Sequence, residues 1–322
     1  MEDLRVGRYN ESSKTAWDDF VSRLEAHSIL FYRDFMDYHK DRFEDYSLMV
    51  FQRKKLIAIL PANIDKEGIV HSHQGLSYGG LLFKPNSSFK LRLAQFAAVM
   101  RFLSSNAIKE LFLKNIPSCY RTDNSDMLVF DWAEAELHRT DIYSYVPKGS
   151  YTVPNRNRSR QLEKAKSQGF EVRKTASFDE FWNGILTPNL KNRFTVNPVH
   201  TLEEIEYLSE KFENELLLYG VYQKDTMRAG IVLFIHRGVV HAQYSAGDEG
   251  RADGSLDYLI DFVVKKYNTT KIFSFGTSSE SKGELLNSGL LYWKESFRSV
   301  NDVQQFFRIG TKNHTTLINR FK

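Results

Sequence analysis

The sequence has little sulfur and no long apolar stretch. Cys119 is the only cysteine among 322 residues, so the chain cannot form an internal disulfide. The mean hydropathy is -0.43, and no uninterrupted apolar run is long enough to span a membrane. The first residues, MEDLRVGRYNESSK, lack the apolar core of a secretory signal peptide. We therefore expect a cytoplasmic protein without a transmembrane segment.

Several common functional signatures are also missing. The sequence contains no P-loop, no glycine-rich dinucleotide fingerprint after a strand and no HExxH metalloprotease motif. His71 and His73 stand two residues apart, but no third ligand follows at a useful spacing, so no metal site is predicted. The net charge is only +4, with a pI near 8.9, which suits an anionic ligand but is too weak to indicate a dedicated nucleic-acid-binding protein.

Apolar and aromatic residues are abundant enough to build packed cores. They make up 42% and 14% of the chain, which excludes global disorder. Strand and helix patterns alternate, which predicts an α/β fold of mixed, mostly antiparallel sheets flanked by helices. The length favours two domains over one. Because Pro147, Gly149 and Pro154 interrupt the chain, we expect an N-terminal domain at 1–148 and a C-terminal domain at 149–322.

The segment at residues 238–297 is the most informative part of the chain. Residues 239–245 and 271–275 each predict a strand. Between them, apolar residues recur at helical spacing and predict an amphipathic helix: Leu256, Leu259, Ile260, Val263, Val264 and Tyr267. Gly254 and Ser255 stand where this helix begins, so backbone N–H groups and the positive helix end would face the preceding loop. Such a turn is suited to bind a phosphate.

The same order of predicted elements occurs twice. Residues 47–115 and residues 215–275 each read as strand, turn, strand, turn, strand, loop, helix and strand. The third strands even share letters, with GIVHSH at 68–73 and GVVHAQ at 238–243. A period this long indicates a duplicated domain and not a solenoid.

Three antiparallel strands, an anion-binding turn into a helix and a further strand resemble the core of the GNAT acyltransferase fold. The doubled arrangement resembles the FemAB-like branch of that superfamily, whose chains carry two such domains in tandem. Four pieces carry the resemblance in the expected order: GLSYGGL at 75–81, RNRSRQLEKAKSQG at 156–169, GRADGSLDYLIDF at 250–262, and FSFGTSSE at 273–280 with LNSGLLYWKESF at 286–297. The resemblance covers nearly the whole chain, and it implies two tandem GNAT-like domains.

The resemblance implies that the second domain holds the acyl donor. GNAT enzymes bind the coenzyme A pyrophosphate with an Arg/Gln-x-x-Gly-x-Gly/Ala turn. Arg251 and Gly254 keep two positions of that turn, whereas Leu256 replaces its last small residue. FemAB-like relatives that use aminoacyl-tRNA also depart from it. The donor-binding residues implied in this way are Ser245, Ala246, Arg251, Gly254 and Ser255.

Three side chains are candidates for the chemistry. Lys294, in LLYWKESF, matches a lysine at the acyl-transfer site of FemAB-like aminoacyl transferases, where a cation would stabilise the oxyanion. Glu280, after the last clear strand, would take a proton from the amine. Tyr244 would protonate a leaving thiolate. An oxyanion-binding backbone N–H is expected near residues 244–246. If this strand is regular, Tyr244 and His241 lie on opposite faces.

The acceptor is expected to meet two other segments. In the family, the glycine-rich loop of the first domain faces the acceptor groove, which here implies His73, Ser77 and Tyr78. The basic segment at 155–168 contacts substrate phosphates in relatives, and Arg156 and Arg160 share one helix face. Each of these residues also fits a plain structural role, as a loop or a solvated helix face.

Three functions follow from these observations. The leading one is an N-acyltransferase that moves an acyl group from acetyl-CoA or another acyl-CoA to the amine of a phosphate-bearing acceptor. That acceptor would be an amino-sugar nucleotide or a cell-envelope or polysaccharide precursor, with peripheral membrane contact if it is lipid-linked. The second keeps the fold but takes aminoacyl-tRNA as donor, as peptidoglycan-bridge enzymes do. The third is a non-catalytic GNAT-like binding protein.

Overall fold

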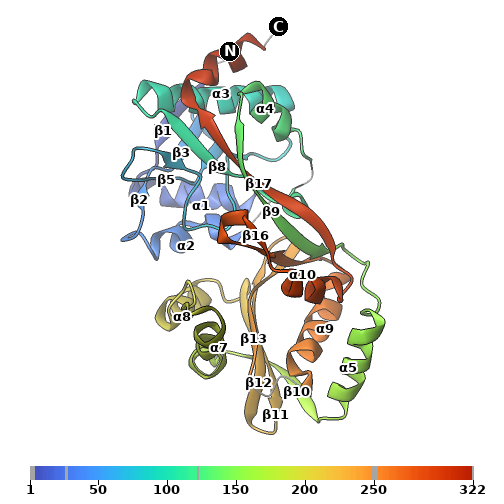
Figure 1. Cartoon of the computed structure of the whole chain (residues 1–322). Coiled ribbons are helices and arrows are strands. Elements are labelled where there is room, and N and C mark those ends of the chain that lie inside the picture. Colours follow the sequence, from blue (N-terminus) through green and yellow to red (C-terminus); the bar gives the residue numbers. More distant parts are fainter. Residues whose placement is uncertain (1–3, 26–27, 122, 249–252, 321–322) are drawn as a thin grey trace. The chain divides into compact units, whose positions relative to one another are not determined.

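The computed structural model describes residues 4–25, 28–121, 123–248 and 253–320, and its contacts group the chain into two compact units. Unit 1 comprises Met1–Asp141 and Val303–Lys322, and unit 2 comprises Ile142–Asp302. The chain leaves unit 1 within β9 (Glu136–Val146) and returns within β17 (Val300–Gly310), as the colours of Figure 1 show. The expected division into domains at 1–148 and 149–322 stays a prediction.

Unit 1 contains two groups of strands. The first has the order β1-β3-β4-β7: β1 (Leu4–Arg8), β3 (Leu48–Gln52), β4 (Lys55–Leu60) and β7 (Leu82–Phe83). The second has the order β17-β8-β6-β5-β2: β8 (Glu110–Lys114), β6 (Val70–His71), β5 (Asn63–Ile64) and β2 (Glu44–Asp45). The helices are α1 (Lys14–Ser22), α2 (Arg33–Asp37), α3 (Phe89–Ser105), α4 (Asp126–Trp132) and α11 (His314–Asn319).

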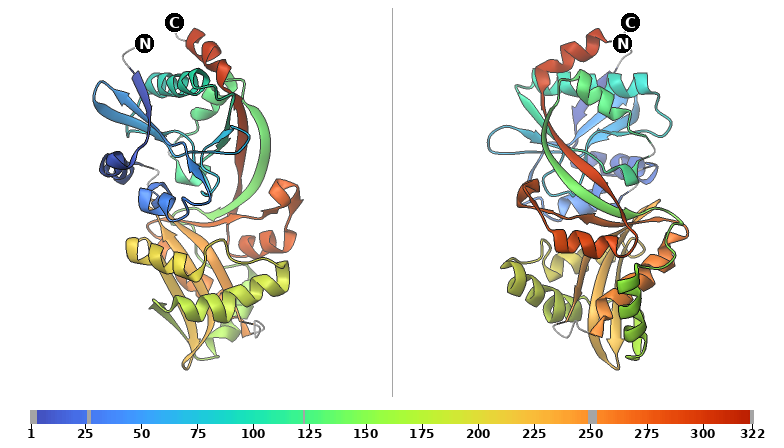
Figure 2. Two further views of the ribbon diagram at one scale, coloured as in Figure 1. Left: turned by 90° about the vertical axis from the view of Figure 1, so that its left-hand side faces the viewer. Right: turned by 45° about the vertical axis from the view of Figure 1, so that its right-hand side comes forward.

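The long helix α3 supplies much of the core of unit 1. Its buried residues Phe96, Met100 and Leu103 belong to one apolar cluster with Leu48 of β3 and Leu111 of β8. Side chains at this spacing share one face of a helix, which explains why α3 packs on the strands. Ser88 begins the helix by accepting a hydrogen bond from Leu91 N. Figure 2 shows α3 beside β1, β3 and β4 in a second view.

Unit 2 is built on one sheet of order β10-β11-β12-β13-β14-β9. The remaining bounds are β10 (Phe170–Thr175), β11 (Leu216–Gln223), β12 (Thr226–Ile235), β13 (Val239–Gly247) and β14 (Ile272–Thr277). A short hairpin of β15 (Ser279–Glu280) and β16 (Leu285–Leu286) follows. The helices are α5 (Arg156–Lys166), α6 (Phe178–Phe181), the π-helical turn η4 (Trp182–Leu186), α7 (Thr187–Phe194), α8 (Leu202–Lys211), α9 (Ser255–Asn268) and α10 (Ser288–Glu295).

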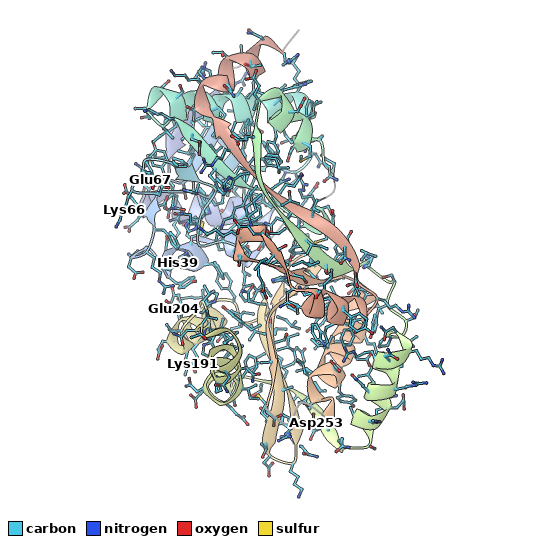
Figure 3. The ribbon with its side chains drawn as sticks, in the orientation of Figure 1. His39, Lys66, Glu67, Lys191, Glu204 and Asp253 are labelled. Carbon is cyan, nitrogen blue, oxygen red and sulfur yellow. The ribbon has the colours of Figure 1, made fainter. Side chains whose placement is uncertain are left out.

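Helices cover both faces of this sheet (Figure 1). On one face, Leu259 and Val263 of α9 pack against Ile231 and Leu233 of β12, and α5 packs on α9. On the other face lie α6, η4, α7 and α8; Lys191 of α7 and Glu204 of α8 mark this side in Figure 3. A Cβ atom at Gly230 would lie 2.2 Å from the ring of Phe181, so a glycine is required for α6 to approach β12 this closely.

The two matched segments occupy matching places in the two units. GIVHSH forms β6, which pairs in parallel with β8 (Val70 with Leu111). GVVHAQ begins β13, which pairs in parallel with β14 (Val240 with Phe273). In each unit the paired strand directly follows the long helix, α3 or α9. The order of elements predicted from the internal repeat is therefore present in the structure.

Candidate active site in unit 2

The sheet of unit 2 opens between β13 and β14. These strands pair from Val239 with Ile272 to His241 with Ser274. Beyond that point, within the described residues, β13 continues along β12 while β14 continues along β9. The register of β13 also shifts by one residue at Gln243. An extra residue of this kind is a β-bulge, which bends and twists the strand. The predicted oxyanion-binding segment at 244–246 directly follows this bulge.

The bulge corrects one prediction about side-chain direction. For a regular strand, His241 and Tyr244 were expected on opposite faces. Instead, His241 pairs with Phe234 and Tyr244 pairs with Val232, and these two partners lie on one face of β12. The expectation assumed a regular strand, and this condition is not met because Gln243 adds a residue between them. Both side chains therefore lie on the face of the sheet that α6, η4 and α8 cover.

A cavity of about 570 Å³ lies in unit 2, beside the end of β13. Ser245, Ala246 and Gly247 form part of its wall, and Gly254 and Leu256 at the start of α9 form another part. The remaining lining comes from α9, η4, α7 and α10 with its capping residue: Asp257, Leu186, Asn189, Leu190, Asn287, Gly289, Leu290 and Trp293. The structure thus brings four predicted donor residues near one cavity, three of them in its wall; Ser255 lies directly behind Gly254.

Lys294 lies at the opening between β13 and β14. It is only 2% exposed, and its Nζ donates to the carbonyl oxygens of Gly276, at 3.0 Å, and Thr277. Within the described part of the chain no salt bridge joins Lys294 to a carboxylate. Burial lowers the pKa of the Lys294 amine to about 7, because water cannot solvate the ammonium. The side chain is therefore poised between its charged and neutral forms near neutral pH.

The other two candidate catalytic residues have protein partners. Glu280, on β15, is exposed and accepts a hydrogen bond at 2.6 Å from Asn287, the residue that caps α10. Tyr244 packs edge-on against Trp182, and its hydroxyl lies 2.6 Å from His200 Nδ1. Burial raises the pKa of Tyr244 to about 12, so the phenol stays protonated at neutral pH. The roles assigned to both residues stay predictions.

The beginning of α9 already carries acidic groups. Gly254 caps the helix with φ +80°, and the carboxylate of Asp253 (Figure 3) accepts from Ser255 N at 2.8 Å. Asp253 is also paired with Arg228. One turn into the helix, Asp257 accepts from Trp293 Nε1 at 2.9 Å and from Arg158. A phosphate that binds Ser255 N would have to displace the Asp253 carboxylate. The predicted donor residue Arg251 lies outside the described residues.

The basic helix α5 presents two of its arginines to solvent. Arg156 and Arg160 are exposed, and Arg160 borders a second hollow of about 420 Å³ together with Tyr292 of α10. Arg158, between them, points inward to Asp257 and Ser296. The helix is therefore divided between a structural arginine and two arginines that remain available for phosphate binding.

The three predicted acceptor residues of the glycine-rich loop, His73, Ser77 and Tyr78, lie in unit 1, where Lys114 holds the loop at 73–80. The Nζ of this lysine donates to the carbonyls of Gln74, at 2.9 Å, and Leu76, at 2.7 Å. His73 and Tyr78 are buried, whereas Ser77 is exposed and its carbonyl accepts from Gln304. The letters GLSYG also fit the G-x-S-x-G pattern, but the loop leads into the short strand β7 and not into a helix, so it is no nucleophile elbow.

Two broader features complete the description. Among the described residues, no group of three His, Cys, Asp or Glu side chains is arranged to hold a metal ion. Over the same residues, no helix combines the length and the apolar character needed to cross a membrane.

Two groups of residues were not predicted. Asp253 and Asp257 were missed as partners of the α9 start, although both stand within the motif itself, where acidic residues often cap a helix. Ser274 and Tyr143 were missed as neighbours of His241. The chain carries no local signal for that cluster, because strands β9, β13 and β14 bring its members together from distant positions.

Comparison with known proteins identifies the fold. No family model and no curated protein matches the sequence. Among solved structures, FemX has a TM-score of 0.67 and 10% identity, covering 98% of this chain and 100% of its own. The C-terminal domain of a putative lysylphosphatidylglycerol synthetase from Agrobacterium fabrum has a TM-score of 0.61 and 11% identity, covering 96% of each chain. L-PGS from Bacillus licheniformis has a TM-score of 0.60 and 10% identity, covering 97% of each chain.

At such identities the likeness shows the fold alone. The chain has the tandem GNAT-like fold that the sequence predicted, and it shares this fold with FemX over nearly its whole length.

Proposed function

We propose that this chain is an acyltransferase that moves an acyl or aminoacyl group to an amine at the opening between β13 and β14. Lys294 carries the proposal. A buried ammonium held by two carbonyls, with no ion-pair partner in the described part of the chain, is costly unless an anion forms beside it. The tetrahedral intermediate of acyl transfer is such an anion, and a preorganised cation lowers the barrier to its formation.

The reaction itself is a simple exchange of bonds. The amine nitrogen attacks the carbonyl carbon of the donor and forms a C–N bond, and the negative charge moves to the carbonyl oxygen. Lys294 stabilises this oxygen with the N–H that its two carbonyl partners leave. Collapse of the intermediate then breaks the bond to the leaving oxygen or sulfur, which takes up the proton that the amine gives up.

The acidic side chains at the start of α9 favour an aminoacyl ester of tRNA as the acyl donor. A coenzyme A pyrophosphate at the start of α9 would meet the carboxylate of Asp253, which already accepts from Ser255 N, and the nearby Asp257. An ester of tRNA needs no pyrophosphate site there. The exposed Arg156 and Arg160 on α5 would instead bind the RNA backbone through charge-assisted hydrogen bonds.

An acyl-CoA is the second candidate donor, and the cavity supports it. The volume of about 570 Å³ lies along Ser245, Ala246 and Gly247, the segment where the family resemblance places a thioester. Much of the lining is apolar, including Leu186, Leu190 and Leu290, which suits the arm of coenzyme A. Binding its phosphates would require Asp253 to move away from the start of α9.

The acceptor is proposed to be an amine on a phosphate-bearing molecule, such as an amino-sugar nucleotide or a cell-envelope precursor. One of the similar structures is named a putative lysylphosphatidylglycerol synthetase, and the lipid in that name carries a phosphate, which supports only the phosphate-bearing part of this proposal.

A transfer assay with two labelled donors tests the proposal. The protein is incubated with labelled aminoacyl-tRNA or labelled acetyl-CoA and a panel of nucleotide amino sugars and aminated lipids, and the label in the acceptor is counted. We expect transfer from one donor, and its loss in Lys294→Met. Transfer that persists unchanged in Lys294→Met would refute the assigned role, and the absence of binding and transfer with both donors would favour a non-catalytic protein.

A further inference from the structure

We propose that His241 is a second, uncharged donor to the oxyanion, held in a single tautomer by Ser274 and Tyr143. The inference rests on the proposed acyl transfer and adds a catalytic residue to it. It concerns the side chains at the last paired position of β13 and β14, where the sheet of unit 2 opens.

Ser274 is the centre of a hydrogen-bonded cluster. Its Oγ lies 2.7 Å from the Tyr143 hydroxyl and 3.1 Å from His241 Nδ1, and it accepts from Gly276 N at 3.3 Å. The three side chains come from the neighbouring strands β9, β14 and β13. Their positions are therefore set by the sheet and not by a loop. A group positioned by sheet hydrogen bonds costs little reorganisation during a reaction.

Counting donors and acceptors at Ser274 leaves two arrangements, and the relative acidity of the hydroxyl groups selects the one that we propose. The Ser274 hydroxyl has one proton and two lone pairs, and Gly276 N–H occupies one lone pair. One proton and one lone pair remain for Tyr143 and His241. A phenol is a stronger acid than an aliphatic hydroxyl, so Tyr143 donates to Ser274, and Ser274 donates to Nδ1 of His241. An imidazole that accepts at Nδ1 carries its own proton on Nε2.

The Nε2 edge of the ring lies beside the group that holds Lys294. A Cβ atom at Gly276, whose φ is +72°, would be 3.1 Å from His241 Cε1 and 3.9 Å from Nε2. The carbonyl of this same glycine accepts from Lys294 at 3.0 Å. His241 and Lys294 therefore lie against one short backbone segment, and in the proposed arrangement the His241 Nε2–H and an N–H of Lys294 bind one oxygen atom of the substrate.

Electrostatics keep the imidazole neutral in this place. Burial and the nearby charge of Lys294 lower the pKa of His241 to about 4. The other groups around the ring, Ser274 and Tyr143, carry no charge at neutral pH, so nothing offsets these two effects. A neutral ring adds a donor to the site without placing a second cation beside Lys294, which would cost further desolvation.

Nuclear magnetic resonance on the free protein tests the tautomer without any substrate. With ¹⁵N-labelled histidine, long-range correlations between ring protons and nitrogens distinguish the two neutral tautomers, and His241→Gln identifies the signals of His241. We expect the Nε2–H tautomer at pH 7, unchanged down to about pH 5. In Tyr143→Phe a mixture of tautomers is expected. Tyr267→Phe is the matched control, because it removes a hydroxyl that bonds Tyr219 on another part of the sheet.

The transfer assay tests whether His241 donates a hydrogen bond to the oxyanion. Loss of one oxyanion donor lowers turnover by about 10²–10³-fold, so His241→Ala is expected to lose kcat in this range with little change in KM. His241→Gln, whose amide N–H can replace Nε2–H, is expected to retain more activity than His241→Ala. An Nδ1–H tautomer or an imidazolium at pH 7 would overturn the inference, as would full kcat in His241→Ala. Absence of transfer by the unaltered protein would instead count against the proposed function, and the NMR result would still decide the tautomer.

Discussion

Replacement of Lys294 by methionine is expected to change how the stability of the protein depends on pH. The Lys294 amine is 2% exposed, and its pKa falls from 10.5 in an exposed lysine to about 7 in the folded chain. Each pKa unit corresponds to about 1.4 kcal/mol, so folding around the protonated amine costs about 5 kcal/mol. Methionine has a similar length and no charge, and it removes this cost.

The direction of this pH dependence follows from the difference in proton binding between the unfolded and the folded chain. Between the folded pKa of about 7 and the unfolded value of 10.5, the unfolded chain binds the proton and the folded chain does not. The free energy of unfolding therefore rises with pH in this range, by up to about 1.4 kcal/mol per pH unit. From pH 7.5 to pH 9.5 the unaltered protein is expected to gain about 2–3 kcal/mol relative to Lys294→Met.

Urea unfolding of the unaltered protein and of Lys294→Met, from pH 7.5 to pH 9.5, measures the difference between their free energies of unfolding. Trp293 is the neighbour of Lys294 and packs against Phe275, so its fluorescence reports the unfolding of this region. Lys114, whose pKa burial lowers to about 8, contributes equally to both proteins and cancels in the comparison. A difference in unfolding free energy that stays constant from pH 7.5 to pH 9.5 would refute the reasoning, because it would show that the folded protein keeps the Lys294 amine protonated.

Three other changes have expected outcomes. Gly230→Ala is expected to destabilise the protein by about 1–3 kcal/mol in thermal unfolding, since the new methyl group would lie 2.2 Å from the Phe181 ring; an unchanged melting temperature would contradict that packing. Asp253→Ala removes the acceptor of an α9 amide and is expected to cost about 1 kcal/mol, while tightening coenzyme A binding in calorimetry if a thioester is the donor. Arg156→Ala and Arg160→Ala are each expected to reduce the slope of log affinity for tRNA against log salt by about 1, and an unchanged slope would place the RNA elsewhere.

Local patterns predicted most elements of the fold correctly. The alternation in ELFLK matches β8 (Glu110–Lys114), and the apolar spacing from Leu256 onward matches α9, because a buried face imposes its period on the sequence. β10 (Phe170–Thr175) was not predicted. It is an edge strand with half of its residues exposed, and its state depends on pairing with β11, which no local pattern reports.

The site was less predictable from the sequence than the fold. The family resemblance pointed to Lys294, and the structure places it at the opening of the sheet, but its lack of an ionic partner among the described residues depends on tertiary packing. The expectation that Tyr244 and His241 lie on opposite faces held only for a regular strand, and one extra residue, Gln243, reverses every later side chain of the strand. The pairing of Asp253 with Ser255 N is local, and a search for caps at the helix start would have found it.

The passage of the chain through β9 and β17 has a consequence for biosynthesis. Because unit 2 is one uninterrupted segment, a ribosome delivers all of it while unit 1 still lacks β17, the partner of β8. Until β17 is synthesised, β8 of unit 1 has an unpaired edge, and an unpaired strand edge promotes aggregation. A chain truncated before residue 303 and released from the ribosome should therefore resist proteolysis over residues 142–302 and remain sensitive over residues 1–141.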